Sequence, residues 1–193
     1  MKTTTTASAA LFSALTFVPT LAHAHPGHGS GFGAGAAHPL TGLDHTLAMM
    51  AVGLWAAQLG GRARWAVPAA FVGVMMLGSA LGMAGVTMPL LEPAILCSVV
   101  ILGLLIAAAA RLPLAASMAL VGCFAAVHGL AHGSELPANA SGFNYTAGFA
   151  LATLALHGAG LALAAGLQRM AATGWVRVAG AAVAIGGLLL AVG

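Results

Sequence analysis

Carboxylate and imidazole side chains gather in two short stretches of this otherwise apolar chain. The first stretch covers residues 38–45 and the second covers residues 128–135. Their candidate ligands are His38, Asp44, His45, His128, His132 and Glu135. Ring nitrogens and carboxylate oxygens together suit Ni2+, Co2+, Zn2+ or Cu2+. The two stretches therefore predict a site for a divalent metal ion.

The spacing of these residues indicates how helices could present them. His128, His132 and Glu135 are four and three residues apart, which places them in one stripe along a helix. Pro39 suits the first turn of a helix, so residues 39 onward are predicted to be helical. One ion could be bound by Asp44, His45 and a bent-back His38, or His38 could be a ligand at the entrance. The sequence does not decide between these arrangements.

Three further residues are weaker candidates. Glu92 could be a ligand, could orient a histidine by accepting from its second ring nitrogen, or could be a helix-start carboxylate. His157 lies near the middle of an apolar run, where it could relay a metal ion or simply bond to a neighbouring helix. Met49 lies one turn after His45, and such a thioether is more typical of a packed core than of a ligand.

The composition indicates an integral membrane protein. Hydrophobic residues make up 61% of the chain and charged residues only 5%, whereas soluble domains have roughly 25% charged residues. The basic residues are scattered singly and form no patch for nucleic acid. No segment resembles an NTP-binding loop. The lipid bilayer is therefore the expected surrounding, and no organic cofactor is expected.

Runs of about 20 apolar residues predict an all-α fold with six transmembrane helices in residues 38–193. The predicted spans are 39–59, 66–85, 89–110, 113–133, 143–168 and 175–192. Glycines at four-residue spacing, at positions 78 and 82 and at positions 129 and 133, predict close helix packing.

The N-terminal region has the pattern of an exported protein. Residues 1–24 predict a cleavable signal peptide, with the small-residue site Ala22-His23-Ala24 at its end; an uncleaved first helix is the alternative. Residues 25–37 are Gly-rich and are expected to form a periplasmic tail. Its histidines, His25 and His28, could add metal ligands or belong to a flexible polar lead.

The arginines are confined to one side of the predicted bundle. They are Arg62, Arg64, Arg111, Arg169 and Arg177, and every one falls in or beside an odd-numbered connection. The positive-inside rule then predicts a bacterial inner-membrane protein with a periplasmic N-terminus. Asp44, Glu92 and Glu135 would all face the periplasm.

The first stretch resembles a known motif. His38-Pro39-(x4)-Asp44-His45, followed by Met49 and Gly53, is similar to the first-span motif of the HupE/UreJ proteins, hydrogenase and urease accessory proteins regarded as nickel permeases. The spacing is also similar to the His-Ala-(x4)-Asp-His motif of the wider nickel/cobalt transporters, with Pro39 in place of Ala. The resemblance implies Ni2+ uptake through His38, Asp44 and His45, with His128, His132 and Glu135 as partners.

The expected function is thus metal transport and not catalysis. Two alternatives remain open: an intramembrane zinc hydrolase, and a metal-binding accessory or sensor subunit that moves no ion. A homo-oligomer or metallocentre assembly proteins are conceivable partners, and the sequence identifies neither.

Overall fold

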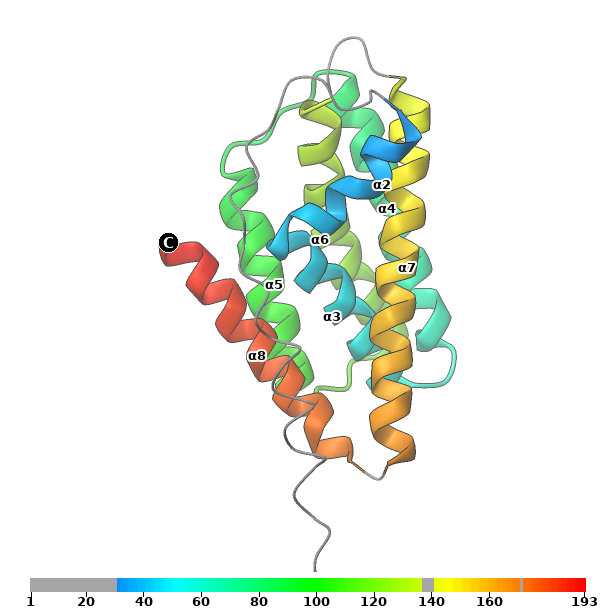
Figure 1. Cartoon of the computed structure of the whole chain (residues 1–193), viewed down its shortest axis with the longest axis vertical. Coiled ribbons are helices and arrows are strands. Elements are labelled where there is room, and N and C mark those ends of the chain that lie inside the picture. Colours follow the sequence, from blue (N-terminus) through cyan, green and yellow to red (C-terminus); the bar gives the residue numbers. More distant parts are fainter. Residues whose placement is uncertain (1–30, 137–140, 171) are drawn as a thin grey trace, which may run out of the picture.

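The computed structural model describes residues 31–136, 141–170 and 172–193. Its regular secondary structure over these residues is seven α-helices (Figure 1), which confirms the all-α prediction for this part of the chain. The predicted signal peptide, residues 1–24, and the histidines His25 and His28 lie outside the described residues.

The predicted first span, residues 39–59, is broken into two helices. α2 spans Phe32–Thr41 and α3 spans Leu43–Leu59. Gly42 between them is extended, with φ −91° and ψ 121°. The expectation of a helix that starts at Pro39 is therefore wrong, since Pro39 lies inside α2. Residues 32–37, assigned to the tail, belong to α2 as well.

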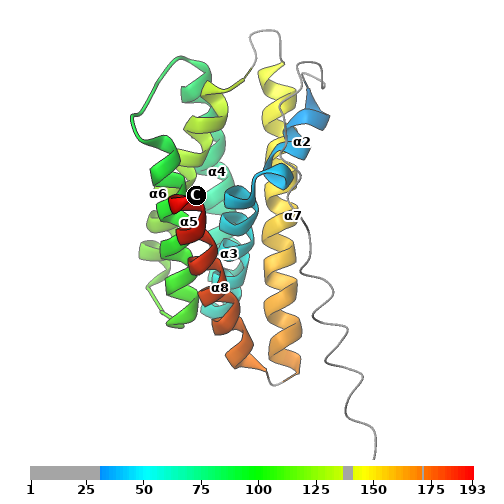
Figure 2. The ribbon, with the colours of Figure 1, turned by 60° about the vertical axis from the view of Figure 1, so that its left-hand side comes forward.

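A threonine side chain and close packing stabilise this break. Thr46 Oγ1 donates to Pro39 O at 2.7 Å, so a carbonyl freed by the break keeps a partner. Gly35 of α2 meets the backbone of Tyr145, and Gly148 meets the backbone of Phe32. α2 thus packs against α7 (Figure 2). The two helices are far apart in the sequence, so local sequence patterns do not predict this contact.

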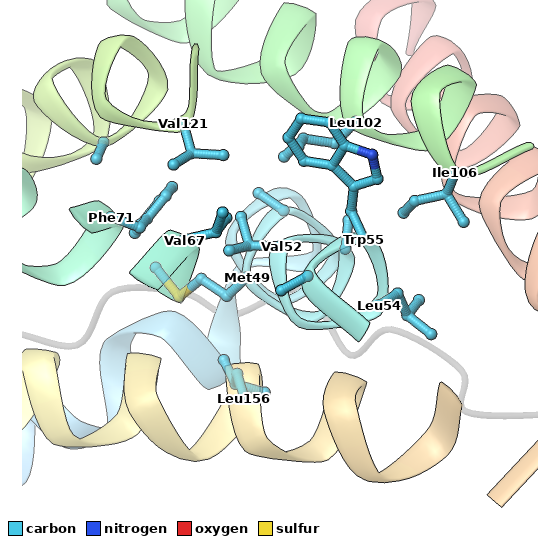
Figure 3. Packing of buried hydrophobic residues seen from close by; sticks show 14 of the residues in the cluster. Met49, Val52, Leu54, Trp55, Val67, Phe71, Leu102, Ile106, Val121 and Leu156 are labelled. Atoms are coloured by element: carbon cyan, nitrogen blue, oxygen red, sulfur yellow. The ribbon is translucent and has the colours of Figure 1, made fainter. Parts of the chain in front are cut away.

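The other helices complete a bundle around α3. They are α4 (Ala63–Met83), α5 (Leu91–Ala107), α6 (Leu114–Ser134), α7 (Gly142–Arg169) and α8 (Thr173–Val192). α3 packs against α4, α5, α7 and α8. Figure 3 shows its side chains Met49, Val52 and Trp55 among residues of the neighbouring helices. A helix that is apolar on every side is expected at such a central place.

Four described helices are long and apolar enough to cross a membrane: α4, α6, α7 and, from Gly174, α8. They correspond to the predicted spans 66–85, 113–133, 143–168 and 175–192. α3 and α5 have 17 residues each, about 25 Å of helix, which is shorter than the roughly 30 Å hydrocarbon layer. The predicted spans 39–59 and 89–110 are thus shorter helices than expected.

The glycine pairs interlock α4 and α6. Gly78 and Gly82 face backbone atoms of α6, while Gly129 and Gly133 face backbone atoms of α4. A Cβ at any of these four positions would lie too close to the opposite helix. The predicted close packing is confirmed, and it brings the histidine-bearing end of α6 against α4.

Charge is divided between the two ends of the bundle. Asp44 and Glu92 lie in the first turns of α3 and α5, and Glu135 directly follows α6. The arginines lie at the opposite ends of the helices, where Arg177 reaches the end of α5 by donating from Nε to Ala107 O at 2.8 Å. The predicted candidate ligands therefore share one end.

Candidate metal centre

Three buried histidines converge where α3 begins and α6 ends. The ring centroid of His45 lies 5.0 Å from that of His128 and 4.5 Å from that of His132. One ligand atom from each ring lies within 4.8 Å of the other two. The three residues are 7%, 0% and 2% exposed, respectively. We refer to His45, His128 and His132 as the histidine triad.

Asp44 orients His45. Its Oδ1 atom accepts from the His45 backbone N and from ring Nδ1, both at 2.8 Å. Since an ionised carboxylate can only accept, His45 carries its ring proton on Nδ1 and has a lone pair on Nε2. This Nε2 is buried and has no hydrogen-bond partner among the described residues. Asp44 therefore hydrogen-bonds to a candidate ligand and is not itself a member of the triad.

Ser98 orients His128 in a similar way. Its hydroxyl donates to Ile95 O at 2.6 Å and lies 3.1 Å from His128 Nε2. Because the hydroxyl proton is committed to the carbonyl, Ser98 accepts from His128 Nε2–H. The lone pair of His128 is then on Nδ1, a buried atom without a partner in the described parts of the chain.

His132 completes the triad with two buried ring nitrogens that pair with no described residue. Buried polar atoms are nearly always hydrogen-bonded, and leaving one unpaired costs about 1–3 kcal/mol. Three adjacent rings, each with an available lone pair, would be an expensive arrangement in a packed core. They match the donor set of a divalent transition metal.

A second group lies on the outer side of the triad. His38, His132 and Glu135 also place one ligand atom each within 4.8 Å of one another. The His38 ring centroid lies 4.6 Å from that of His132, and Glu135 is exposed. The break at Gly42 brings His38 here, because a continuous helix would separate His38 from His45 by about 10 Å along its axis; their ring centroids are 5.9 Å apart.

The acids at this end influence one another. Although Glu135 is exposed as a whole residue, partial desolvation of its carboxyl raises the pKa of that group above its usual value, and the nearby Glu92 carboxylate adds to the rise. Glu92 is exposed in the first turn of α5 and belongs to neither group of candidate ligands. A cation bound at this end would offset the repulsion between the two carboxylates.

His157 lies deeper and outside both groups. Its Nδ1 donates to Met49 O at 2.8 Å, and its Nε2 is buried without a partner within the described residues. The Phe71 ring packs against both His157 and His128, at centroid distances of 5.2 Å and 5.8 Å. The Met49 thioether accepts from Thr153 Oγ1 at 3.3 Å, so Met49 is a core residue that positions His157 through its carbonyl.

Ser98, Phe71 and Phe149 were not predicted as parts of the site. Phe149 of α7 packs against the triad at His132, with ring centroids 4.1 Å apart. Ser98 is the one of the three with a usable signal, because a polar residue in an apolar run needs a partner. The two phenylalanines are indistinguishable from ordinary membrane-core residues in the sequence.

Comparison with known proteins agrees with the motif. The family model described as HupE / UreJ protein matches residues 12–190. Protein HupE of Rhizobium leguminosarum bv. viciae is 47% identical over 194 residues, an alignment that covers 99% of this chain and 97% of that protein. No solved structure matches the chain. By both the family model and this full-length similarity, the chain belongs to the HupE / UreJ family.

Proposed function

We propose that this protein is a permease that carries a divalent transition metal, Ni2+ foremost, from the periplasm into the cytoplasm for metalloenzyme assembly. The observation that carries the proposal is the histidine triad: three buried imidazoles at one end of an apolar bundle, each with an unpaired ring nitrogen, and with one ligand atom from each ring within 4.8 Å of the other two. Asp44 behind His45 supplies a negative charge that offsets part of the ion's lost hydration.

The ligand types favour transient binding. Neutral imidazoles bind Ni2+, Co2+, Zn2+ and Cu2+, whereas thiolates would hold a late transition metal more firmly. Conduction needs sites that are strong enough to capture an ion and weak enough to release it. The choice of Ni2+ among these ions rests on the family.

The arrangement supports a stepwise route. His38 and Glu135 form the outer step, and His132 belongs to both the outer group and the triad. An ion could therefore move inward by exchanging one ligand at a time. His157 would be the next imidazole, with the Phe71 ring packed against both it and His128.

The membrane potential is a sufficient energy source for this direction. A divalent cation that moves inward gains about 4.6 kcal/mol per 100 mV of inside-negative potential, twice the value for a single charge. This corresponds to roughly a thousandfold accumulation or more. ATP hydrolysis is not required.

Reconstitution tests the proposal. Purified protein in liposomes with an imposed inside-negative potential should take up radioactive nickel in a saturable manner, with Co2+, Zn2+ and Cu2+ as competitors. Collapse of the potential should slow uptake. If the protein binds nickel but its liposomes take up no more nickel than empty liposomes do, it would instead be an accessory or sensor subunit.

A zinc hydrolase is the second candidate, because three histidines with an open fourth position also describe a catalytic zinc site. The two functions differ in metal retention. A catalytic zinc should co-purify at one ion per chain and survive dialysis, whereas transported nickel should exchange with added metal within minutes. Stoichiometric, non-exchanging zinc would favour the hydrolase.

Cysteine labelling tests the proposed direction. Thr87 lies at the triad end and Ala108 at the arginine end, and both are exposed. After replacement of Cys97 and Cys123 by Ala, Thr87→Cys should react with a membrane-impermeant reagent in spheroplasts and Ala108→Cys should not. If only Ala108→Cys is labelled, the arginine end faces the periplasm and the proposed orientation is wrong.

A further inference from the structure

The arginine end of the bundle contains no counter-charge from the chain itself. The sequence has only three acidic residues, and Asp44, Glu92 and Glu135 all lie at the triad end. The one ion pair among the described residues joins Asp44 to His45. Five arginines therefore share one end of a membrane-embedded protein with no carboxylate to pair with.

Two cavities lie among these arginines. One, of about 290 Å³, is lined by Arg111, Arg177 and the polar side chains of Gln58 and Gln168. The other, of about 430 Å³, is lined by Arg111 and Arg62 together with leucines. Both are several times the roughly 30 Å³ of a water molecule in the liquid, so either accommodates a phosphate group. Arg111 borders both cavities.

The walls of the first cavity are held by hydrogen bonds at the end of α5. Arg177 Nε donates to Ala107 O at 2.8 Å, and Gln58 Nε2 donates to Ile106 O at 3.1 Å. Trp55 Nε1 donates to Ala110 O at 3.0 Å. Since Arg177 uses only Nε for this bond, its two terminal amino groups remain available. A guanidinium fixed in this way is suited to bidentate recognition of phosphate oxygens.

The surroundings place this end at a membrane surface. Trp65 and Trp175 are 71% and 60% exposed and lie in the first turns of α4 and α8, beside the arginines. Exposed tryptophans at helix ends are typical of the membrane–water interface. Basic pockets between helices at such an interface recognise anionic headgroups.

We propose that Arg111 and Arg177, with Arg62 beside them, bind the phosphate group of an anionic molecule at this end of the bundle. The phosphate of an anionic membrane lipid and free phosphate share the chemistry that the arginines recognise. The site is independent of the histidine triad and of the direction of transport. Its occupant supplies the negative charge that the chain lacks at this end.

Thermal unfolding of the full-length protein in a nonionic detergent tests the proposal. Titration with phosphatidylglycerol should raise the unfolding temperature to a plateau, and phosphatidylcholine at the same concentrations should not. Titration with inorganic phosphate identifies the source: a plateau there as well shows that the phosphate group suffices, and its absence shows that the lipid is needed. Equal effects of both lipids, or no effect of phosphatidylglycerol and phosphate, would overturn the proposal.

Arg111→Gln is the decisive variant, because Arg111 borders both cavities and its side chain bonds to no other described residue. The phosphatidylglycerol concentration at half-effect should rise about fivefold, the factor expected for one arginine at the surface. Arg64→Gln is the control, since Arg64 is at the same end but lines neither cavity. Arg111→Lys keeps the charge but loses the planar guanidinium, so its half-effect concentration should fall between those of the wild type and Arg111→Gln; this intermediate value separates binding from misfolding. If Arg111→Gln and Arg64→Gln lose the same amount of phosphatidylglycerol affinity, the effect comes from the overall positive charge at this end. That result would contradict a specific phosphate site.

Discussion

Ser98 determines which nitrogen of His128 is available. The Ser98 hydroxyl gives its proton to Ile95 O at 2.6 Å and is therefore the acceptor for His128 Nε2–H at 3.1 Å. Nδ1 of His128 is left with its lone pair in the triad. A small polar residue on α5 thus sets which ring nitrogen of a residue on α6 carries the proton.

Ser98→Ala should weaken nickel binding about tenfold or more, because outer partners that orient metal-bound histidines contribute at this level. Calorimetric titration of the purified protein measures the effect. Ser117→Ala is the control, since Ser117 is equally buried but bonds to Leu112 O at the other end of α6. Unchanged affinity in Ser98→Ala would remove Ser98 from the site.

Asp44→Asn should lower nickel binding and uptake at least tenfold while the protein still inserts. Asparagine keeps the shape of the side chain but loses its negative charge. That charge fixes the Nδ1–H form of His45 and offsets the positive charge of the metal ion. Binding is measured by calorimetry and uptake in proteoliposomes, per inserted molecule. Wild-type uptake in a well-expressed Asn variant would contradict the role given to Asp44.

His45→Ala and His157→Ala should affect different steps, metal binding in the first variant and the rate of uptake in the second. His45 is a triad member, so its loss should weaken binding itself. His157 belongs to neither group of candidate ligands, so its loss should lower the maximal uptake rate while calorimetric affinity stays nearly unchanged.

A purely structural role for His157 gives another pattern. Loss of its 2.8 Å bond to Met49 O would then lower the unfolding temperature and the yield, with normal uptake per molecule. That result would remove His157 from the route.

Gly129→Ala should destabilise the protein by about 1–3 kcal/mol, the usual cost of overpacking. The new methyl group would collide with the backbone of α4 at Met75 and Ser79. Gly122→Ala on the same helix is the matched control, because its nearest neighbour, Val74 Cγ2, would lie at 3.7 Å, an ordinary contact. It should be neutral or stabilising. Denaturant unfolding in detergent compares the two, and equal stabilities would contradict the interlocked packing of α4 and α6.

The sequence was most informative where a local pattern matches a physical requirement. Four predicted spans correspond to long apolar helices because hydropathy and length are local properties. The glycine pairs of α4 and α6 pack as their spacing predicts. His38, His45, His128 and His132 lie at one end because alternating helices return to the same side, and the sidedness of the arginines already indicates this arrangement.

Other features depend on contacts that are distant in the sequence. The break at Gly42 is supported by packing of α2 on α7 through Gly35 and Gly148, and no local signal predicts that packing. Asp44 was predicted as a ligand because carboxylates bind metals, yet the structure places its Oδ1 against His45. The contribution of Ser98 depends on a neighbour 30 residues away.

X-ray absorption at the nickel edge tests the central claim, that the cargo is bound by the imidazoles of His45, His128 and His132. Protein loaded with one equivalent of Ni2+ should show the outer-shell scattering of about three imidazole rings. His128→Ala should lose one ring, whereas His157→Ala should keep all three. A spectrum with only oxygen ligands, or one that His128→Ala leaves unchanged, would contradict the account.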